Sequence, residues 1–357
     1  TGRQEGDVGV SSLTWETVTK ANLGLEIELR KALEIQLDVF KESRRDIFMQ
    51  RKNFPASAGF PSAPWANFGK VDNKGFETTV ILNKPINKDW AISARATATY
   101  AVNKILERDE APGVLGTSRS KVGKPINQLW GLVAERLYTE DDFSDLYTNT
   151  LKPDIPTPMF SEKVNPGDIK YLDIDGNGVV DGMDETAIGR TTDPQLVYGF
   201  AASVNYKYFD FAFLFQGNAL TDRIIAQGNN FIPGSQSGTT GNIYSNGYDA
   251  WTAENPRQDA FYPRLYIGQN TNNRQPSTWW LKDMSMLRIK NLEIGYSLPH
   301  IRTDKLAIKH VRIYLRATNL LCFSKFKLWD PELDSNENNG SNYPMMRSVS
   351  IGLDVTF

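Results

Sequence analysis

The sequence has few of the features that mark disulfide-bonded, helical membrane or nucleic-acid-binding proteins. Cys322 is its only cysteine, so no internal disulfide framework can form. No run of apolar residues approaches the roughly 18 that a transmembrane helix needs. The 40 basic and 42 acidic side chains nearly cancel, which argues against a nucleic-acid surface. Residues 1–10 are polar and rich in glycine, so we expect no signal peptide there.

A recognisable catalytic constellation is also missing from the sequence. There is no nucleophile with a partnered base and no glycine-rich loop of the phosphate-binding type. Carboxylate pairs such as Glu26 and Glu28 occur within predicted strands, where a solvated lining is a better interpretation than acid–base catalysis. We therefore expect a protein that is not an enzyme.

The end of the chain gives the clearest secondary-structure signal. Residues 346–357 alternate strictly between apolar and polar side chains and finish on an aromatic residue. This alternation predicts a β-strand with one apolar and one polar face. The last strand of an outer-membrane barrel has this form, and so has a strand of a soluble β-sandwich. The apolar row consists of Val349, Ile351, Leu353, Val355 and Phe357.

The same alternation recurs along the chain and predicts nine long strands. In the first two of them, one entire face carries Glu, Gln, Asp and Arg, which a sheet buried on both sides could not tolerate. That face is therefore expected to be in contact with water. The expected strands cover residues 21–31, 32–49, 73–84, 90–102, 195–206, 211–219, 284–297, 307–321 and 346–357.

The connections between these strands alternate in length. Outer-membrane barrels have short periplasmic turns and long extracellular loops, so this alternation predicts an antiparallel transmembrane β-barrel. The expected strand at 90–102 runs outward and that at 195–206 runs inward, so an even number of membrane crossings must lie within 103–194. We therefore expect 126–138 to form an extracellular hairpin. Nine crossings are an odd number, which predicts a piece of a larger barrel. Short connections at 31–32, 85–89, 207–210 and 298–306 alternate with long ones at 50–70, 103–194, 217–283 and 323–345.

One stretch of the chain carries a chemical motif. Oxygen-bearing side chains occupy positions 1, 3, 5, 9 and 12 of a twelve-residue loop, with Gly178 at position 6 and a backbone carbonyl at position 7. This is the spacing of a calcium loop, although its last acidic residue is an Asp where Glu is usual. A solvated acidic turn and a magnesium site are the alternatives. The predicted ligands are Asp173, Asp175, Asn177, Val179, Asp181 and Asp184.

Several motifs together resemble one family. The chain resembles the C-terminal part of SusC/RagA-like TonB-dependent outer-membrane transporters of the Bacteroidetes, and the resemblance runs along nearly all 357 residues. The segments that carry it are Tyr171–Asp184, Pro194–Gly217, Trp280–Pro299, Thr318–Leu320, Trp329–Glu332 and the terminal Phe357.

The resemblance implies a particular architecture and function. It implies that residues 1–357 form the C-terminal part of a 22-stranded barrel, with 103–194 as an extracellular region that includes the calcium-type loop. The N-terminal plug and the earlier strands of the family are absent from the sequence. It further implies import of oligosaccharides or peptides across the bacterial outer membrane, with a SusD-like surface lipoprotein as lid and TonB as energy coupler.

A second interpretation of the sequence stays open at this point. A secreted, calcium-stabilised β-sandwich that binds glycans would also have a calcium loop and aromatic residues in its loops. Under either interpretation these aromatics would contact a ligand or pack against one another, and in the importer they could also pack against the lid. The loop aromatics concerned are Trp251, Phe261, Tyr262, Tyr266, Trp279 and Trp280.

Overall fold

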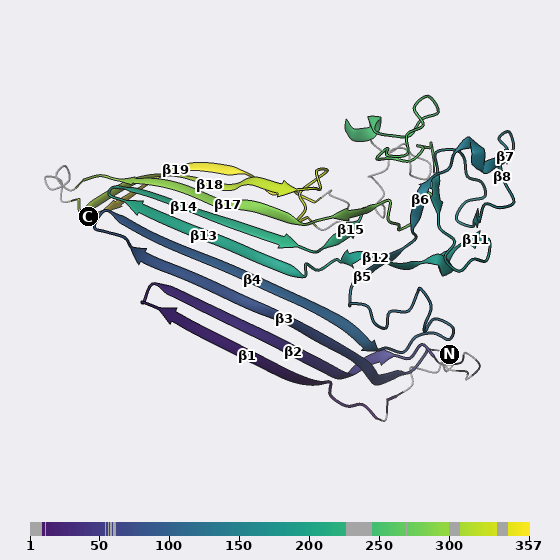
Figure 1. Ribbon diagram of the computed structural model, residues 1–357, viewed down its shortest axis with the longest axis horizontal. Helices are drawn as coiled ribbons and strands as arrows, with labels where there is room; N and C mark the ends of the chain where they lie inside the picture. Colours follow the sequence, from purple (N-terminus) through teal and green to yellow (C-terminus); the bar gives the residue numbers. More distant parts are fainter. Residues whose placement is uncertain are drawn as a thin grey trace, which may run out of the picture.

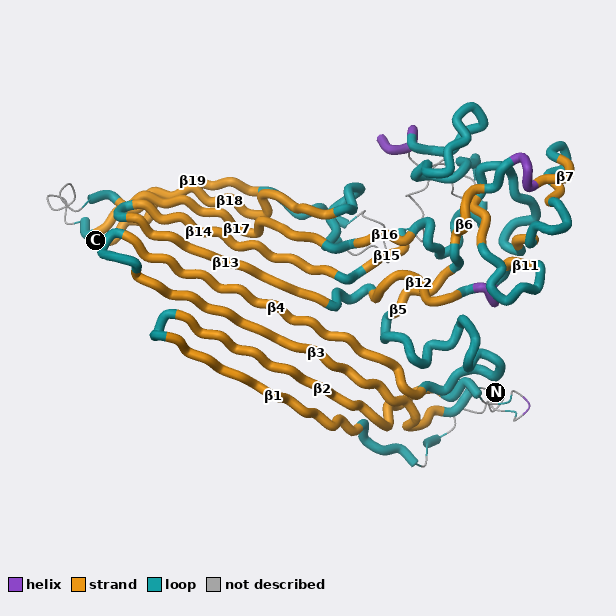
Figure 2. Tube along the Cα trace, in the orientation of Figure 1, coloured by secondary structure: helices purple, strands orange, loops and turns teal. Residues whose placement is uncertain are grey.

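The protein folds into one large open sheet with a loop-built body at one end, as Figures 1 and 2 show. The computed structural model describes residues 9–10, 12–53, 55, 57, 59, 62–225, 245–268, 270–299, 308–333 and 342–357. Strands dominate this part of the chain, and its helical elements are the short 3-10 turns η2 (Glu140–Asp142), η3 (Gly182–Asp184) and η4 (Ser245–Tyr248). None of its helices has the length and apolar character needed to cross a membrane.

The nine predicted long strands are all present and form a single antiparallel sheet. Each strand pairs with its neighbours in the order β1-β2-β3-β4-β13-β14-β17-β18-β19. Because nine is an odd number, the two edge strands run toward the same end; β1 and β19 do not pair with each other, so the sheet is open. The strands are β1 (Thr17–Leu29), β2 (Leu33–Gln50), β3 (Trp65–Pro85), β4 (Trp90–Glu107), β13 (Leu196–Tyr206), β14 (Phe209–Ala219), β17 (Met286–Ser297), β18 (His310–Ser324) and β19 (Ser348–Thr356).

Strand β3 begins earlier than its alternation predicts, inside a segment that we expected to be loop. Trp65 pairs with Gln50 at the end of β2, beyond two irregularities in the register. The ring of Trp65 stacks on that of Phe48 with centroids 5.2 Å apart. Cross-strand aromatic contacts of this kind stabilise a sheet locally, so they extend the β2–β3 ribbon past the predicted boundary.

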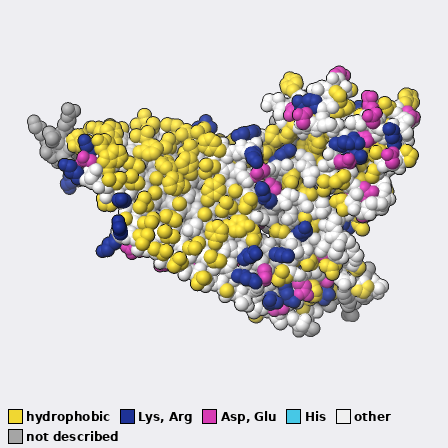
Figure 3. Space-filling view, viewed as in Figure 1, with side chains coloured by type: hydrophobic (Ala, Val, Ile, Leu, Met, Phe, Trp, Pro, Cys, Tyr) yellow, Lys and Arg dark blue, Asp and Glu magenta, His cyan; other side chains and the backbone are white. Residues whose placement is uncertain are grey.

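The two faces of the sheet differ in polarity, as the sequence predicts. On the β1–β2 ribbon, Leu25 lies opposite Leu37 on one face, while Glu28 lies opposite Glu34 on the other. Figure 3 shows hydrophobic side chains covering the sheet, with charged side chains gathered toward its ends. The apolar row remains open to the surroundings: Ile351 of β19 is 80% exposed.

At the long-loop end, the connections fold into a second region, which we call the loop module: the described residues of 108–195, 220–285 and 325–333. It contains five short pairs of strands (Figure 1) and nearly all of the buried hydrophobic core. The pairs are β5 (Gln128–Gly131) with β12 (Thr186–Thr191), β6 (Ala134–Leu137) with β10 (Ile169–Tyr171), β7 (Phe143–Asp145) with β8 (Thr150–Leu151), β9 (Thr157–Pro158) with β11 (Val179–Val180), and β15 (Asp222–Ile224) with β16 (Leu281–Asp283).

The predicted hairpin at 126–138 is wrong in its pairing. Two strands do form there, but β5 pairs with β12 and β6 pairs with β10, so they do not pair with each other. Alternation within a short segment predicts the strands but cannot select a partner. Here the partners come from more than 30 residues away, where the module core supplies apolar contacts for both.

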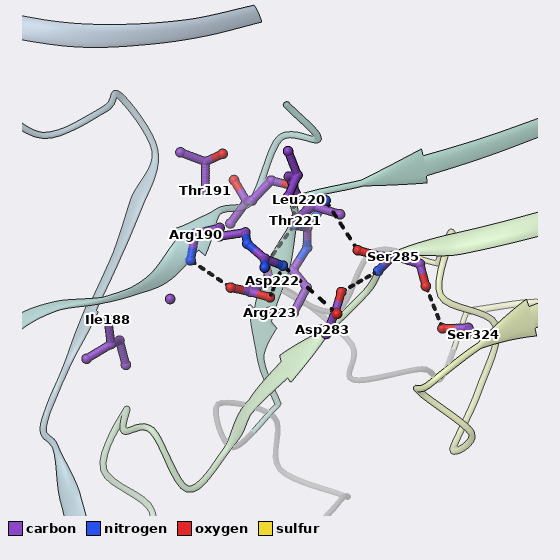
Figure 4. A network of polar contacts seen from close by, with 12 residues as sticks. Ile188, Arg190, Thr191, Leu220, Thr221, Asp222, Arg223, Asp283, Ser285 and Ser324 are labelled. Carbon is purple, nitrogen blue, oxygen red and sulfur yellow. Dashed lines mark hydrogen bonds and ion pairs between the residues drawn. The ribbon is translucent and has the colours of Figure 1, made fainter. Parts of the chain in front are cut away.

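A polar network joins the loop module to the sheet (Figure 4). The backbone N–H of Arg190 donates to Asp222 Oδ2 at 2.7 Å, and its guanidinium lies 3.9 Å from Asp283. Asp283 Oδ1 accepts from the backbone N–H of Ser285 at 2.8 Å. The Ser324 hydroxyl donates to the Ser285 carbonyl at 2.9 Å, which brings in β18. Three segments far apart in sequence are thus fixed at the start of β17.

Candidate functional site

The predicted calcium loop is a compact turn between β10 and η3. Gly176 and Gly178 have φ angles of 73° and 83°, in the left-handed region that glycine adopts without steric cost. These two residues reverse the chain, after which Val179 and Val180 pair with β9 in parallel. The sharp turn at position 6 of the loop is therefore present.

Three of the predicted ligands converge. One carboxylate oxygen from each of Asp173, Asp175 and Asp184 lies within 4.8 Å of the others. Calcium binds oxygen at about 2.3–2.6 Å, so oxygens that share one ion lie up to about 5 Å apart. The spacing therefore fits a calcium ion with these three ligands.

The side chains of two other predicted ligands are engaged in local hydrogen bonds. Asn177 Oδ1 accepts from the backbone N–H of Val179 at 2.8 Å. Asp181 Oδ1 accepts from the backbone N–H of Met183 at 2.6 Å and so caps η3. The structure thus brings Asp173, Asp175 and Asp184 together, while the side chains of Asn177 and Asp181 bond within their own turns.

Backbone amides hold two of the converging carboxylates in place. Asp173 is partly desolvated, which raises its pKa, but the N–H groups of Gly178, Gly176 and Asn177 donate to it and bring the net pKa below its usual value. Asp184 is fully buried, and its oxygens accept from the N–H groups of Ile174 at 2.7 Å and Asp181 at 2.9 Å. Asp184 therefore shapes the loop in addition to any role as a ligand.

The polar face of the sheet carries a charged network near its short-turn end. Arg312 of β18 donates to Asp210 of β14 through Nε at 2.9 Å and also contacts Glu293 of β17. Arg316 Nε donates to Glu293 Oε2 at 2.6 Å, and Arg312 lies 3.4 Å from Asp354 of β19. The network links four neighbouring strands and gives this face a fixed polar lining.

A buried carboxylate in the loop module joins two loops and was not predicted from the sequence. Asp168 is fully buried and accepts from the hydroxyl of Tyr266 at 2.7 Å and from the side-chain amide of Asn273 at 2.7 Å. Burial raises its pKa, against the lowering effect of these donors. No sequence signal identifies this pairing, because the partners lie about 100 residues apart.

The aromatic residues of the loops are mainly structural. Trp251, Tyr262 and Trp280 belong to the buried core of the module, with Phe261 and Trp279 packed against it. For these five side chains the structure shows packing against one another and against the module core.

A second unpredicted contact fixes the chain after β18. Arg288 of β17 is 3% exposed and forms ion pairs with Asp330 and Glu332 at 2.5 and 3.0 Å. Phe326 and Trp329 of the same segment pack on the module core. The segment that follows β18 is thereby held against β17.

Comparisons with known proteins point in one direction. No family model matches the chain. A TonB-dependent receptor of Formosa agariphila is 27% identical over 98% of this chain and 35% of the relative. The TonB-dependent receptor SusC of Bacteroides thetaiotaomicron is 22% identical over 97% of this chain and 32% of the relative. The chain thus spans about a third of the length of these curated relatives. These relatives are named as receptors.

Solved structures show the same fold. The RagAB peptide importer in its closed-closed state matches with a TM-score of 0.69 and 24% identity, over 97% of this chain and 36% of that one. Its open-open state matches with a TM-score of 0.70 and 21% identity, over 98% of this chain and 36% of that one. The chain is thus similar to TonB-dependent receptors of the bacterial outer membrane, and it fits the C-terminal part of a SusC-like fold.

Proposed function

We propose that the chain is part of an energy-coupled, TonB-dependent importer of oligosaccharides or peptides in the outer membrane. The observation that carries the proposal is the nine-stranded sheet with one exposed apolar face and one polar face. Large apolar side chains such as Leu23, at 76% exposure, and Ile351 have no protein layer over them in the described residues. Burial of such surface in lipid is worth about 25 cal/mol per Å².

This arrangement disfavours the alternative of a secreted glycan-binding sandwich. A sandwich buries the apolar face of one sheet against the apolar face of a second. Among the described residues no second large sheet faces the first, and the main hydrophobic core lies in the loop module. The calcium-type loop is also part of that module and not of a sandwich.

In the proposed importer, the short turns lie in the periplasm and the loop module lies outside the cell. Residues 103–194, with the calcium-type loop, then belong to the extracellular region. A SusD-like surface lipoprotein would cover this region, and TonB would act through a part of the receptor outside this sequence. The relatives named as TonB-dependent receptors support the coupling, and the likeness to a peptide importer supports peptides as one substrate class.

Uptake by living cells tests the proposal. A strain that lacks the complete receptor is complemented with the wild-type gene, in backgrounds with and without TonB, and given labelled oligosaccharides or labelled peptides. We expect uptake of one of the two classes, lost on deletion of either the receptor or TonB. Native mass spectrometry of the extracted complex then identifies the lid and the full receptor chain. The proposal would be contradicted if the purified receptor were a soluble monomer in buffer without detergent or lipid.

We also propose that the loop from Asp173 to Asp184 binds a structural calcium ion. The motif spacing and the convergence of three carboxylates support it. Like charges at this distance repel one another, and a divalent cation removes that repulsion. Magnesium fits less well because it prefers fewer protein ligands and strict octahedral geometry.

A single substitution separates calcium binding from loop folding. Asp175 is exposed and its carboxylate bonds only within the loop, to Asn177. Asp175→Asn in the complete receptor should therefore weaken calcium binding about tenfold while leaving the calcium-free loop folded. Terbium luminescence measures binding, and proteolysis of the loop with and without chelator measures folding. Absence of terbium binding by the wild type would refute the calcium site.

A further inference from the structure

A cavity of about 560 Å³ lies on the polar face at the long-loop end of β2, β3 and β4. Its size is typical of sites for small molecules. Apolar side chains from three adjacent strands form one wall, and the segment that follows β4 forms another. These apolar residues are Ile47, Met49, Val71, Ile105, Ile126 and Trp130.

The charges that line this cavity are unbalanced. Three cationic side chains line it: Lys52, Arg108 and Lys121. The carboxylates that line it are Glu107 and Asp109, and both are neutralised by cations that are not among the lining residues. Lys70 pairs with Glu107, and Arg51 Nε donates to Asp109 at 2.6 Å.

Two carboxylates hold the backbone of the segments that carry Lys52 and Lys121 in position. Asp109 is 6% exposed and accepts from the backbone N–H of Lys52 at 2.7 Å. Glu110 accepts from the backbone N–H of Lys121 at 2.6 Å. These contacts use the main chain, so both ammonium groups stay available to the cavity.

The three cations are close enough to affect one another. Desolvation lowers the pKa of Lys121, and repulsion from Arg108 and Lys52 lowers it further, against the attraction of Glu110 and Glu185. The ammonium of Lys121 also lies 5.8 Å from the centroid of the Trp130 ring. An anion bound among these groups would relieve the repulsion, and the aromatic ring offers a flat apolar surface beside it.

We propose that this cavity binds a carboxylate group carried on an apolar or ring-shaped body. The carboxylate of a peptide C-terminus and that of an acidic sugar share this chemistry. A neighbouring cavity of about 390 Å³ shares Ile47, Val71, Pro125 and Ile126 as lining residues, so a ligand longer than one unit has room to continue along the polar face. The role of this cavity as a substrate subsite rests on the proposed import function. Binding of a carboxylate in the cavity does not depend on that function.

Calorimetry with the purified complete receptor in detergent tests the binding. One arm compares N-acetylated Ala-Ala-Phe with its C-terminal amide, and the other compares trigalacturonate with its methyl ester. We expect the charged member of at least one pair to bind on the order of tenfold tighter, because charge-assisted hydrogen bonds are lost with the carboxylate. The arm that shows the difference identifies the source of the carboxylate.

Variants assign that difference to the cavity. The triple variant K52Q/R108Q/K121Q should lose the preference for the charged ligand, while Lys121→Arg, which keeps the charge, should retain it. Lys163→Gln removes a lysine of the loop module outside this cavity and serves as the control. Equal binding of charged and neutral ligands in both arms, or an unchanged preference in the triple variant, would overturn the proposal. If the receptor binds the charged ligand but cells do not take it up in a TonB-dependent manner, the result counts against the import function and not against binding in the cavity.

Discussion

The sheet and the loop module bury apolar side chains in opposite ways. In the module, Tyr262 and Trp280 are fully buried inside a protein core. In the sheet, residues of the same character, such as Ile351 and Leu23, point away from the protein and are 80% and 76% exposed. One chain thus contains a region organised like a water-soluble domain and a region organised for a different solvent.

This difference shows why mean composition conceals the membrane-facing part of the chain. The mean hydropathy is -0.42, as in many soluble proteins. Only alternate residues of each strand face outward, and the polar residues between them cancel their contribution. The signal lies in the pattern along each strand and not in the average.

The largest contrast is expected for removal of a core side chain from the module. Trp280→Ala should destabilise the module by about 3–5 kcal/mol, because it leaves a cavity in the core. Hydrogen exchange of residues 245–285 should report the loss while the sheet stays protected. The control is Ile351→Ala, which removes an exposed side chain and should leave exchange in the module unchanged. Equal loss of protection in sheet and module would mean that the two regions unfold as one.

A charged side chain on the apolar face should destabilise the sheet in a membrane. Ile351→Lys near the middle of β19 should cost about 2–4 kcal/mol in a bilayer. The matched substitution Ser348→Lys, on the polar face of the same strand, should cost far less. Denaturant unfolding of the complete receptor in lipid vesicles measures both. Similar costs for the two would contradict the assignment of the faces.

The smallest effect is expected at Asp168 and depends on pH. Its pKa is raised in the folded state, so its contribution favours folding below the usual value of 3.8 and is lost as the pH rises through the folded-state pKa. The Asp168→Asn variant should therefore show a weaker decline of module stability over that range than the wild type. Proteolysis of the loop at several pH values measures the difference in slope. If module stability declined with pH equally in the variant and the wild type, Asp168 would not be the cause of that decline.

Local patterns predicted much of this structure. Alternation such as Leu25 and Ile27 against Glu26 and Glu28 located the long strands, because a two-residue period determines which face each side chain joins. The spacing of Asp173, Asp175 and Asp184 predicted that they converge, since a twelve-residue loop with glycine at its turn brings them together.

Contacts between distant segments were not predictable. The partners of β5 and β6, the Asp168–Tyr266 contact and the cavity beside Lys121 all bring together segments that are separated in the sequence. No periodicity encodes such pairings, because they depend on how the module core packs. The prediction of a hairpin at 126–138 failed for this reason.

The network around Arg190, Asp222 and Asp283 has a consequence for folding kinetics. Pairing of β4 with β13, and of β14 with β17, requires closure of the two longest loops in the sheet, and closure entropy rises with loop length. Contacts that join these loops to each other shorten the free chain that remains to be ordered. Formation of the loop module is therefore expected to accelerate the non-local strand pairing, so that substitutions in the network slow folding more than their effect on equilibrium stability suggests.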